Sequence, residues 1–405
     1  MKTVIRNGNL LDTTAMTIAG EQTVVIENGI ITSVGEEPVG EVDLSIDAAG
    51  HFLMPGFIDG HAHFRLATMD FQRLSQWSEV EFGIAMEKLS AATLGRGFTT
   101  VRDLGGDVSG LMRAIAQGMA VGPRIFHAGR MLTQTGGHGD VDSSERPVPD
   151  CGCQIRHDSF SIIADGVDAV RKGARHILRD GSDFIKIHVS GGVASPSDPL
   201  DSVQYTTEEI AAVTQEARNR HTYVAAHAYT PPAIRQAVEN GVMTIEHGNL
   251  IDKPVAKLMA EKGAVLVPTL STYEAMHDVG KQLGLPARNL EKNSIVYEAG
   301  IASLELAKSA GVTLGFGTDL IGETQVRQNR EFAIRADVEP AKDILHSMYH
   351  VNAKLCRMEG KAGVLSPGAF GDVVISRADP LEDIVALSRP EETITSVIFN
   401  GQLLD

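Results

Sequence analysis

Eight short apolar runs, separated by longer helix-like stretches, constrain the fold most strongly. In chain order they are GFIDGHAHF, FTTVRDLG, RIFHAG, FIKIHVSG, TYVAAHAY, MTIEHGN, AVLVPTLS and LGFGTD. Alternating strands and helices predict a parallel sheet with right-handed crossovers. Eight such units match a closed (β/α)8 TIM barrel, an α/β fold. An open doubly wound sheet is the alternative, but no strand is followed by a Gly-x-Gly-x-x-Gly turn.

The two ends of the chain share a different pattern. KTVIRNGNLLD and QTVVIENGIITSVG near the start alternate apolar and polar residues around Asn-Gly pairs, which is typical of β-hairpins. FGDVVISRAD and TITSVIFNGQLLD repeat this pattern near the end. We therefore predict a small β-sandwich domain composed of residues 1–55 and 360–405, with the barrel formed by residues 56–359.

Six residues that suit a metal site lie at or near the ends of five of the barrel runs: His61, His63, Lys186, His227, His247 and Asp319. Active sites of such barrels lie at the C-terminal ends of the strands. The predicted fold therefore gathers these six side chains at one face of the molecule.

The four histidines predict two metal positions. His61 and His63 are two residues apart in a strand, so both side chains point to the same face. Imidazole suits zinc, and two rings on one face can bind one ion. His227 and His247 end successive strands, as a second metal site requires. Each histidine alone also fits a buried, hydrogen-bonded core residue.

Lys186 and Asp319 complete the set. Burial disfavours a charged lysine, so Lys186 is expected as a neutral amine that can react with carbon dioxide. The resulting carbamate has two oxygens able to bridge two cations; the alternative is an ion pair with a nearby carboxylate. His188 shares the inward face of the strand with Lys186. It is expected either to support the metal ligands without binding a metal itself or to pack in the core. Asp319 is predicted to coordinate a metal and act as general base, or else to cap a helix.

Composition excludes several classes of function. The 405 residues carry a net charge of -16, which argues against binding to nucleic acid or anionic lipid. The first residues contain no apolar core of signal-peptide length, so we expect a cytoplasmic protein. Three cysteines do not form a disulfide framework, and Cys151-Gly152-Cys153 is interpreted as reduced thiols rather than a metal site.

These residues together match a known family. With PGFIDGHAHF as its opening strand and the order His-x-His, Lys, His, His, Asp, the chain resembles the amidohydrolase superfamily, in the subtype with a carboxylated lysine. The resemblance implies two divalent ions, expected to be zinc by ligand type, and hydrolysis of an amide bond by a metal-bridging hydroxide. It places His61, His63 and Asp319 on one metal, His227 and His247 on the other, and N6-carboxylated Lys186 between them.

Within that superfamily the chain resembles Xaa-Pro dipeptidases, Xaa-Arg/Lys carboxypeptidases and ochratoxin-hydrolysing amidases. TQTGGHGD, IKIHVSGGVASPSDPLDSVQYTTEEI and AAHAYTPPAIRQAVENGVMTIEHGNLI carry this resemblance. It implies that His138 meets the scissile carbonyl and that Tyr229 binds the substrate's terminal carboxylate. Arg235 is a further candidate for that carboxylate, although it also fits a solvated helix face. The loop 193–205 fits either a lid or a plain connection.

The leading hypothesis is therefore a dipeptidase or carboxypeptidase that releases a C-terminal residue, with Xaa-Pro favoured. A dipeptide or N-acyl amino acid is the expected substrate, and we expect a homo-oligomer. The alternative is a cyclic amidohydrolase such as an imidazolonepropionase, and a minor one is an inactive scaffold. A deaminase is disfavoured because Ala228-Tyr229-Thr230 follows His227, where a His-x-x-Glu motif would place glutamate.

Overall fold

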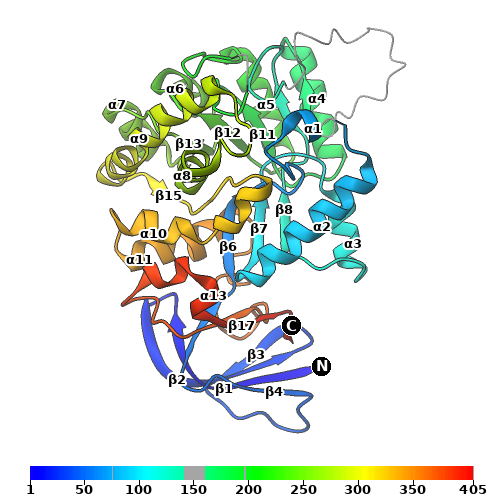
Figure 1. Cartoon of the computed structure of the whole chain (residues 1–405), viewed down its shortest axis with the longest axis vertical. Helices are drawn as coiled ribbons and strands as arrows, with labels where there is room; N and C mark the ends of the chain where they lie inside the picture. Colours follow the sequence, from blue (N-terminus) through cyan, green and yellow to red (C-terminus); the bar gives the residue numbers. More distant parts are fainter. Residues whose placement is uncertain (75, 141–159, 196–197, 405) are drawn as a thin grey trace.

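The computed structural model describes residues 1–74, 76–140, 160–195 and 198–404. The Cys151-Gly152-Cys153 segment of the sequence analysis lies outside these residues. Figure 1 shows two regions, one rich in helices and one made mostly of strands from both ends of the chain. Among the described residues, no helix is both long and apolar enough to cross a membrane.

Seven of the eight predicted runs contain a β-strand, and the eighth, LGFGTD, meets its strand only at Leu314; within each of two sheets the strands pair in parallel. The strands are β6 (Phe57–Ala62), β7 (Phe98–Asp103), β8 (Arg124–His127), β11 (Ile185–His188), β12 (Val224–Ala228), β13 (Thr244–His247), β14 (Val265–Val267) and β15 (Thr313–Leu314). Two short strands that the apolar pattern does not single out, β9 (Met131–Thr133) and β10 (Ser161–Ile163), also take part. The resulting sheets have the orders β6-β7-β8 and β10-β9-β11-β12-β13-β14-β15.

Backbone hydrogen bonds connect the two parallel sheets on both sides. The amide of Asp183, just before β11, donates to the carbonyl of His127 in β8 at 2.9 Å. The amide of Gly60 in β6 donates to the carbonyl of Phe316, just after β15, at 2.7 Å. The strand pairing itself defines two separate sheets, so closure into one eight-stranded barrel stays a prediction.

Helices follow most of the parallel strands. The helices of this region are α1 (Phe71–Leu74), α2 (Glu79–Gly95), α3 (Ser109–Ala116), α4 (Val167–Arg179), α5 (Thr207–Asn219), α6 (Pro231–Glu239), α7 (Lys253–Lys262), α8 (Leu270–Val279), α9 (Ala287–Ser309), α10 (Arg330–Ala336), α11 (Ala341–His346) and α12 (Asn352–Leu355), with the short turns η1 (Gly322–Arg327) and η2 (Ser347–Val351). Two of the helices begin with a capping box, Ser78–Glu81 at α2 and Thr206–Glu209 at α5. Each box satisfies amide groups that a helix start leaves unpaired.

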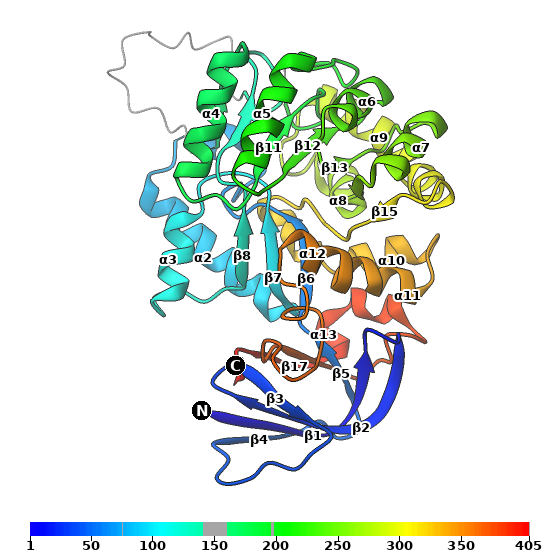
Figure 2. The ribbon, with the colours of Figure 1, turned by 180° about the vertical axis from the view of Figure 1, so that it is seen from behind.

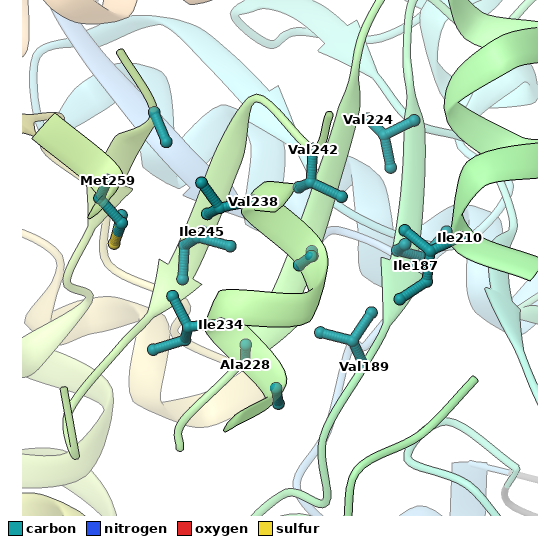
Figure 3. Packing of buried hydrophobic residues seen from close by; sticks show 14 of the residues in the cluster. Ile187, Val189, Ile210, Val224, Ala228, Ile234, Val238, Val242, Ile245 and Met259 are labelled. Carbon is teal, nitrogen blue, oxygen red and sulfur yellow. The ribbon is translucent and has the colours of Figure 1, made fainter. Parts of the chain in front are cut away.

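The largest hydrophobic cluster lies between β11–β13 and the helices that follow them. Figure 3 shows Ile187, Val224 and Ile245 from the strands packed against Ile234 and Val238 of α6. All five side chains are buried. Because alternate strand residues point into this core, the others are free to face the opposite side, where the candidate site lies.

Strands from both ends of the chain form the third sheet, in the order β18-β17-β16-β5-β1-β2-β3, with β4 paired to β1. Its strands are β1 (Lys2–Asp12), β2 (Thr17–Glu27), β3 (Ile30–Val34), β4 (Leu44–Asp47), β5 (Phe52–Pro55), β16 (Val373–Ser376), β17 (Ile394–Phe399) and β18 (Gln402–Leu403), with η3 (Ile384–Ser388) and α13 (Pro390–Thr393) beside them. Figure 2 shows both termini on this sheet. Its arrangement as a sandwich and the boundaries 1–55 and 360–405 stay predictions.

One predicted hairpin in this sheet is wrong. Asn7-Gly8 lies inside the single strand β1, where the pairing with β2 is irregular between Ile5 and Gly8. Asn7 has a φ of 55°, so the pair forms a bulge and not a turn. Asn28-Gly29 does connect two antiparallel strands, β2 and β3, as predicted. The same dipeptide serves both purposes because asparagine and glycine tolerate positive φ.

Candidate metal centre and substrate site

The six predicted residues lie within parallel strands or beyond their C-terminal ends. His61 lies in β6 and His63 just after it, and Lys186, His227 and His247 lie in β11, β12 and β13. Asp319 was expected to close the last strand, but β15 ends at Leu314 and the chain continues without regular pairing to Asp319. The backbone amide of Asp319 donates to the carbonyl of His61 at 2.8 Å, which brings the carboxylate beside the histidines.

Unusual backbone conformations place two of these side chains. His247 has a φ of 78° and Asp319 a φ of 52°, values that non-glycine residues seldom adopt. Such conformations cost roughly 1–3 kcal/mol each and concentrate at functional sites. Gly317 makes the approach possible, because a Cβ there would lie 2.8 Å from Cβ of His61. The segment around Asp319 is thus held close to β6.

Asp319 is the centre of the cluster. Its Oδ1 lies 3.2 Å from Nε2 of His61 and 3.1 Å from Nε2 of His63. Its Oδ2 lies 3.9 Å from Nδ1 of His247. Candidate ligand atoms of His61, His247 and Asp319 all lie within 4.8 Å of one another, which is close enough for one metal ion to contact all three.

The hydrogen bonds of His61 and His63 show which ring nitrogens are available to a metal. Glu246 Oε2 lies 2.8 Å from Nδ1 of His61, and the Gly105 carbonyl lies 3.3 Å from Nδ1 of His63. Both oxygens only accept, so each Nδ1 carries the hydrogen and each neutral ring has its lone pair on Nε2. These lone pairs face the Asp319 carboxylate, and the buried Nε2 of His61 has no hydrogen-bond partner. A cation between them resolves the repulsion, so the donor set fits a metal ion.

His227 and His247 lie beside this cluster. Their ring centroids are 4.6 Å apart, and the ring of His247 is 5.1 Å from that of His61. Nε2 of His227 donates to the Gly191 carbonyl at 3.1 Å, which leaves a lone pair on Nδ1. Nδ1 of His247 lies 2.8 Å from the Thr269 hydroxyl. Burial lowers the pKa of both rings well below the usual value, so both are neutral and able to bind a metal.

Lys186 is buried in β11 among these groups. Burial lowers the pKa of its amine to about 8, against the opposing effects of Glu246 and Asp319. Burial also works against ionisation of Asp319, but positive charge and N–H donation from His61 and His63, when their rings are protonated in the absence of a metal, hold the pKa of that carboxyl well below its usual range, and a cation in place of those protons acts in the same direction. The site therefore combines an ionised carboxylate with an amine that loses its proton unusually easily.

A buried arginine–glutamate pair, which was not predicted from the sequence, supports the cluster. Arg102 Nη2 in β7 lies 2.9 Å from Oε1 of Glu246 in β13, and both side chains are fully buried. Glu246 also accepts from the Thr244 hydroxyl at 2.6 Å, besides its contact with His61. The pair fixes the orientation of the His61 ring. The available signal was a charged residue inside an apolar run, the same signal that singled out Lys186.

His138 and Tyr229 lie next to the histidine cluster. The His138 ring stacks on that of His227 with centroids 4.2 Å apart, and the Tyr229 ring lies 5.4 Å from that of His247. The Tyr229 hydroxyl is 2.9 Å from the hydroxyl of Tyr273 in α8, a residue that was not predicted from the sequence. Both tyrosines are buried, and their two hydroxyl groups are polar groups in otherwise apolar surroundings.

Arg235 lies apart from the other predicted site residues. It is on α6 with its side chain 44% exposed, and its guanidinium is 3.6 Å from Glu239 one turn along the same helix. Among the described contacts, none joins it to the predicted residues. His188, by contrast, is buried with its ring 4.9 Å from that of His138, and its Nδ1 has no hydrogen-bond partner.

Comparison with known proteins gives one consistent set of relatives. A model of the amidohydrolase family matches residues 52–404. An ochratoxinase of Aspergillus niger is 29% identical over 400 residues, which cover 94% of this chain and 82% of the relative. The crystal structure of a prolidase complexed with N-methylphosphonate-L-proline has a TM-score of 0.95 at 41% identity over 100% of both chains. A Xaa-Pro dipeptidase with bound methionine has a TM-score of 0.89 at 30% identity, also over 100% of both chains.

Proposed function

This chain belongs to the amidohydrolase family and is an amide-hydrolysing enzyme, and we propose that it cleaves the amide bond before the C-terminal residue of a dipeptide or N-acyl amino acid. Xaa-Pro is the favoured substrate. The observation that carries the proposal is the convergence of His61, His63 and His247 on Asp319 at the strand ends. The full-length similarity to a prolidase, a Xaa-Pro dipeptidase and an ochratoxinase supports the substrate class.

The family uses metal ions, and we propose two divalent ions, zinc by ligand type. His61, His63 and Asp319 would hold one ion, and His227 and His247 the other. Lys186, carboxylated by carbon dioxide, would bridge them, and the low pKa of its amine supports that modification. Bound zinc supplies Lewis acidity, which polarises a carbonyl and lowers the pKa of water.

The chain's own side chains carry the proton transfers and the binding of substrate. Asp319, kept ionised by the neighbouring rings, takes a proton from the attacking water and passes it to the leaving nitrogen. His138 contacts the oxygen of the scissile carbonyl. Tyr229 donates its hydroxyl hydrogen to the terminal carboxylate, and the contact with Tyr273 orients that hydroxyl.

The surroundings of the two tyrosines favour an uncharged C-terminal residue. Tyr229 and Tyr273 belong to one buried cluster with Val193, Met276 and Ile321. An apolar wall of this kind stabilises proline or another apolar side chain and gives no partner to a charged lysine or arginine. Arg235 is left out of carboxylate binding because of its contact with Glu239. We also propose that the two parallel sheets close into the (β/α)8 barrel that presents this site.

Initial rates on a panel of substrates test the proposal. The zinc-loaded enzyme is given Leu-Pro, Leu-Phe, Leu-Arg, their N-acetyl forms and imidazolonepropionate, and release of the free amino acid is measured. We expect Leu-Pro and Leu-Phe to be cleaved and Leu-Arg to be poor. Turnover of imidazolonepropionate with no release of amino acid from any peptide would replace the proposal by ring opening.

A further inference from the structure

Helix α8 carries Tyr273, whose hydroxyl contacts Tyr229, and its first turn is capped by a residue from another helix. Thr269 precedes α8 with a φ of 50°, and among the described contacts its side chain makes no capping hydrogen bond. The first amides of a helix have no acceptor within the helix, and an unpaired buried amide is unfavourable. Leu270 and Ser271 are buried, so their amides need an acceptor from elsewhere in the chain.

The carboxylate of Glu331 in α10 is that acceptor. Its Oε1 accepts a hydrogen bond from the amide of Leu270 at 3.3 Å, and its Oε2 accepts from the amide of Ser271 at 2.7 Å. The Glu331 side chain is fully buried. Negative charge at the start of a helix also interacts favourably with the helix dipole. One side chain of α10 therefore caps a helix that begins 61 residues earlier in the sequence.

A buried carboxylate is an expensive way to cap a helix. Burial raises the pKa of the Glu331 carboxyl group to about 7, although the positive charge of Arg335 acts in the opposite direction. Above that pH the carboxylate is ionised, and its burial makes folding less favourable than exposure to water would. A local N-cap side chain would pair an amide of the first turn without burying a charge. The arrangement is therefore explained by a need to fix α8 in one position.

The position of the first turn determines where the Tyr273 hydroxyl lies. Tyr273 comes one turn after Leu270 in α8, and its ring is buried. From α9, Asn293 Nδ2 donates to the backbone carbonyl of Tyr273 at 3.0 Å. In such close packing a shift of the helix start moves the phenol with it. The 2.9 Å contact between the hydroxyls of Tyr273 and Tyr229 therefore depends on the cap.

We propose that Glu331 is a positioning residue for substrate binding. It holds the first turn of α8, and thereby it sets the position of the Tyr273 hydroxyl and, through that hydroxyl, of Tyr229. The inference rests on the proposed function only in assigning the terminal carboxylate of the substrate to Tyr229.

The neighbouring residue Arg330 offers a matched control on the same two helices. Its Nη2 lies 2.7 Å from Oε1 of Glu274 in α8. The Arg330 side chain is 44% exposed, and an exposed ion pair contributes little to holding two helices together. Arg330 and Glu331 therefore both connect α10 to α8, but only the contact of Glu331 is buried at the helix start.

Kinetics of Glu331→Gln test the proposal at about pH 8.5, where the Glu331 carboxyl group of the wild type is ionised. Glutamine has the same shape but one acceptor oxygen, so one amide of the first turn loses its partner. We expect KM for Leu-Pro to rise about 3- to 10-fold, the upper limit being loss of the whole Tyr229 contact, with kcat changed less than about twofold. KM for Leu-Pro amide should be unchanged. Arg330→Gln should leave the constants of both substrates unchanged.

A double-mutant cycle separates a positioning role from a general loosening of the fold. Tyr273→Phe removes the hydroxyl through which Glu331 acts. Adding Glu331→Gln to Tyr273→Phe should therefore raise KM for Leu-Pro no further, because the two substitutions break the same chain of contacts. Independent effects on KM that multiply in the double variant would overturn the inference.

The outcomes also separate this inference from the proposed function. If the wild type cleaves dipeptides and Glu331→Gln does so with the same KM, the inference fails and the function stands. If the wild type cleaves no dipeptide, the proposed function fails, and a crystal structure of Glu331→Gln decides the inference, since an intact contact between the two phenol hydroxyls overturns it.

Zinc content is measured in every variant, because the first turn of α8 also reaches the segment before Asp319. The Ser271 hydroxyl donates to the carbonyl of Thr318 at 3.3 Å. A loss of zinc in Glu331→Gln, or an equal fall in turnover of Leu-Pro and Leu-Pro amide, would assign the effect to the metal site and overturn the positioning role.

Discussion

Replacing Lys186 by methionine should make the metal-free protein more stable while it abolishes activity. The amine is buried, and its pKa falls from 10.5 to about 8 in the folded chain. Between these two values the unfolded chain binds more protons than the folded one, so the free energy of unfolding rises with pH. At neutral pH the folded protein therefore carries the cost of a protonated, buried lysine. Methionine has a similar length and no charge, so the cost disappears.

The size of the effect follows from the shift in pKa. A change in pKa from 10.5 to about 8 lowers the free energy of unfolding by about 3 kcal/mol at pH 7. At pH 9.5 the reduction is only about 1 kcal/mol, because the buried amine of the folded chain is then mostly neutral. Lys186→Met should thus gain about 3 kcal/mol at pH 7 and about 1 kcal/mol at pH 9.5. Activity should be lost at both values, because the proposed bridging group is absent.

Urea unfolding followed by circular dichroism measures this difference. Both proteins are stripped of metal with a chelator and kept free of carbon dioxide, so that no carbamate forms. Lys308→Met is the matched control, since the Lys308 ammonium pairs with Asp343 at 2.8 Å near the surface and should contribute below about 1 kcal/mol. A variant Lys186→Met that is less stable than the wild type at pH 7, or equally stabilised at both pH values, would refute the reasoning.

Three further predictions concern the site and its support. Asp319→Ala should lower turnover by roughly 10²- to 10⁴-fold with an unchanged circular dichroism spectrum, and normal rates would exclude Asp319 as the general base. Tyr229→Phe should raise KM about tenfold for free-acid dipeptides but not for their amides, and equal effects would remove it from carboxylate binding. Arg102→Met should cost about 3–5 kcal/mol of unfolding free energy, because it leaves Glu246 buried without its partner. Arg389→Met, which breaks an exposed pair of the same 2.9 Å length, should cost below about 1 kcal/mol, and equal losses would contradict the role of burial.

The sequence predicted the parts of the site that depend on local pattern. Strand alternation places His61 and His63 on one face, and the ends of successive strands place His227 and His247 side by side. The structure brings these four rings and Asp319 together. The period of two along a strand accounts for His61 and His63, whereas His247 and Asp319 reach the site through backbone conformations with positive φ that a strand pattern does not predict.

Contacts between distant segments could not be predicted in the same way. The pair of Arg102 and Glu246 joins residues 144 positions apart, so it depends on which strands face each other. The approach of Asp198 and Ser195 to His138 depends on how one loop folds over another. Asn7-Gly8 illustrates the opposite error, since the local signal for a turn is genuine but long-range pairing keeps β1 as one strand.

Titration of the metal-free enzyme with zinc, while proline release from Leu-Pro is followed, measures whether hydrolysis depends on two metal ions. We expect no turnover without metal and a rise in rate that ends near two zinc ions per chain. Full turnover in the metal-free protein would contradict metal-dependent hydrolysis, and saturation at one ion per chain would contradict the bridging role of Lys186.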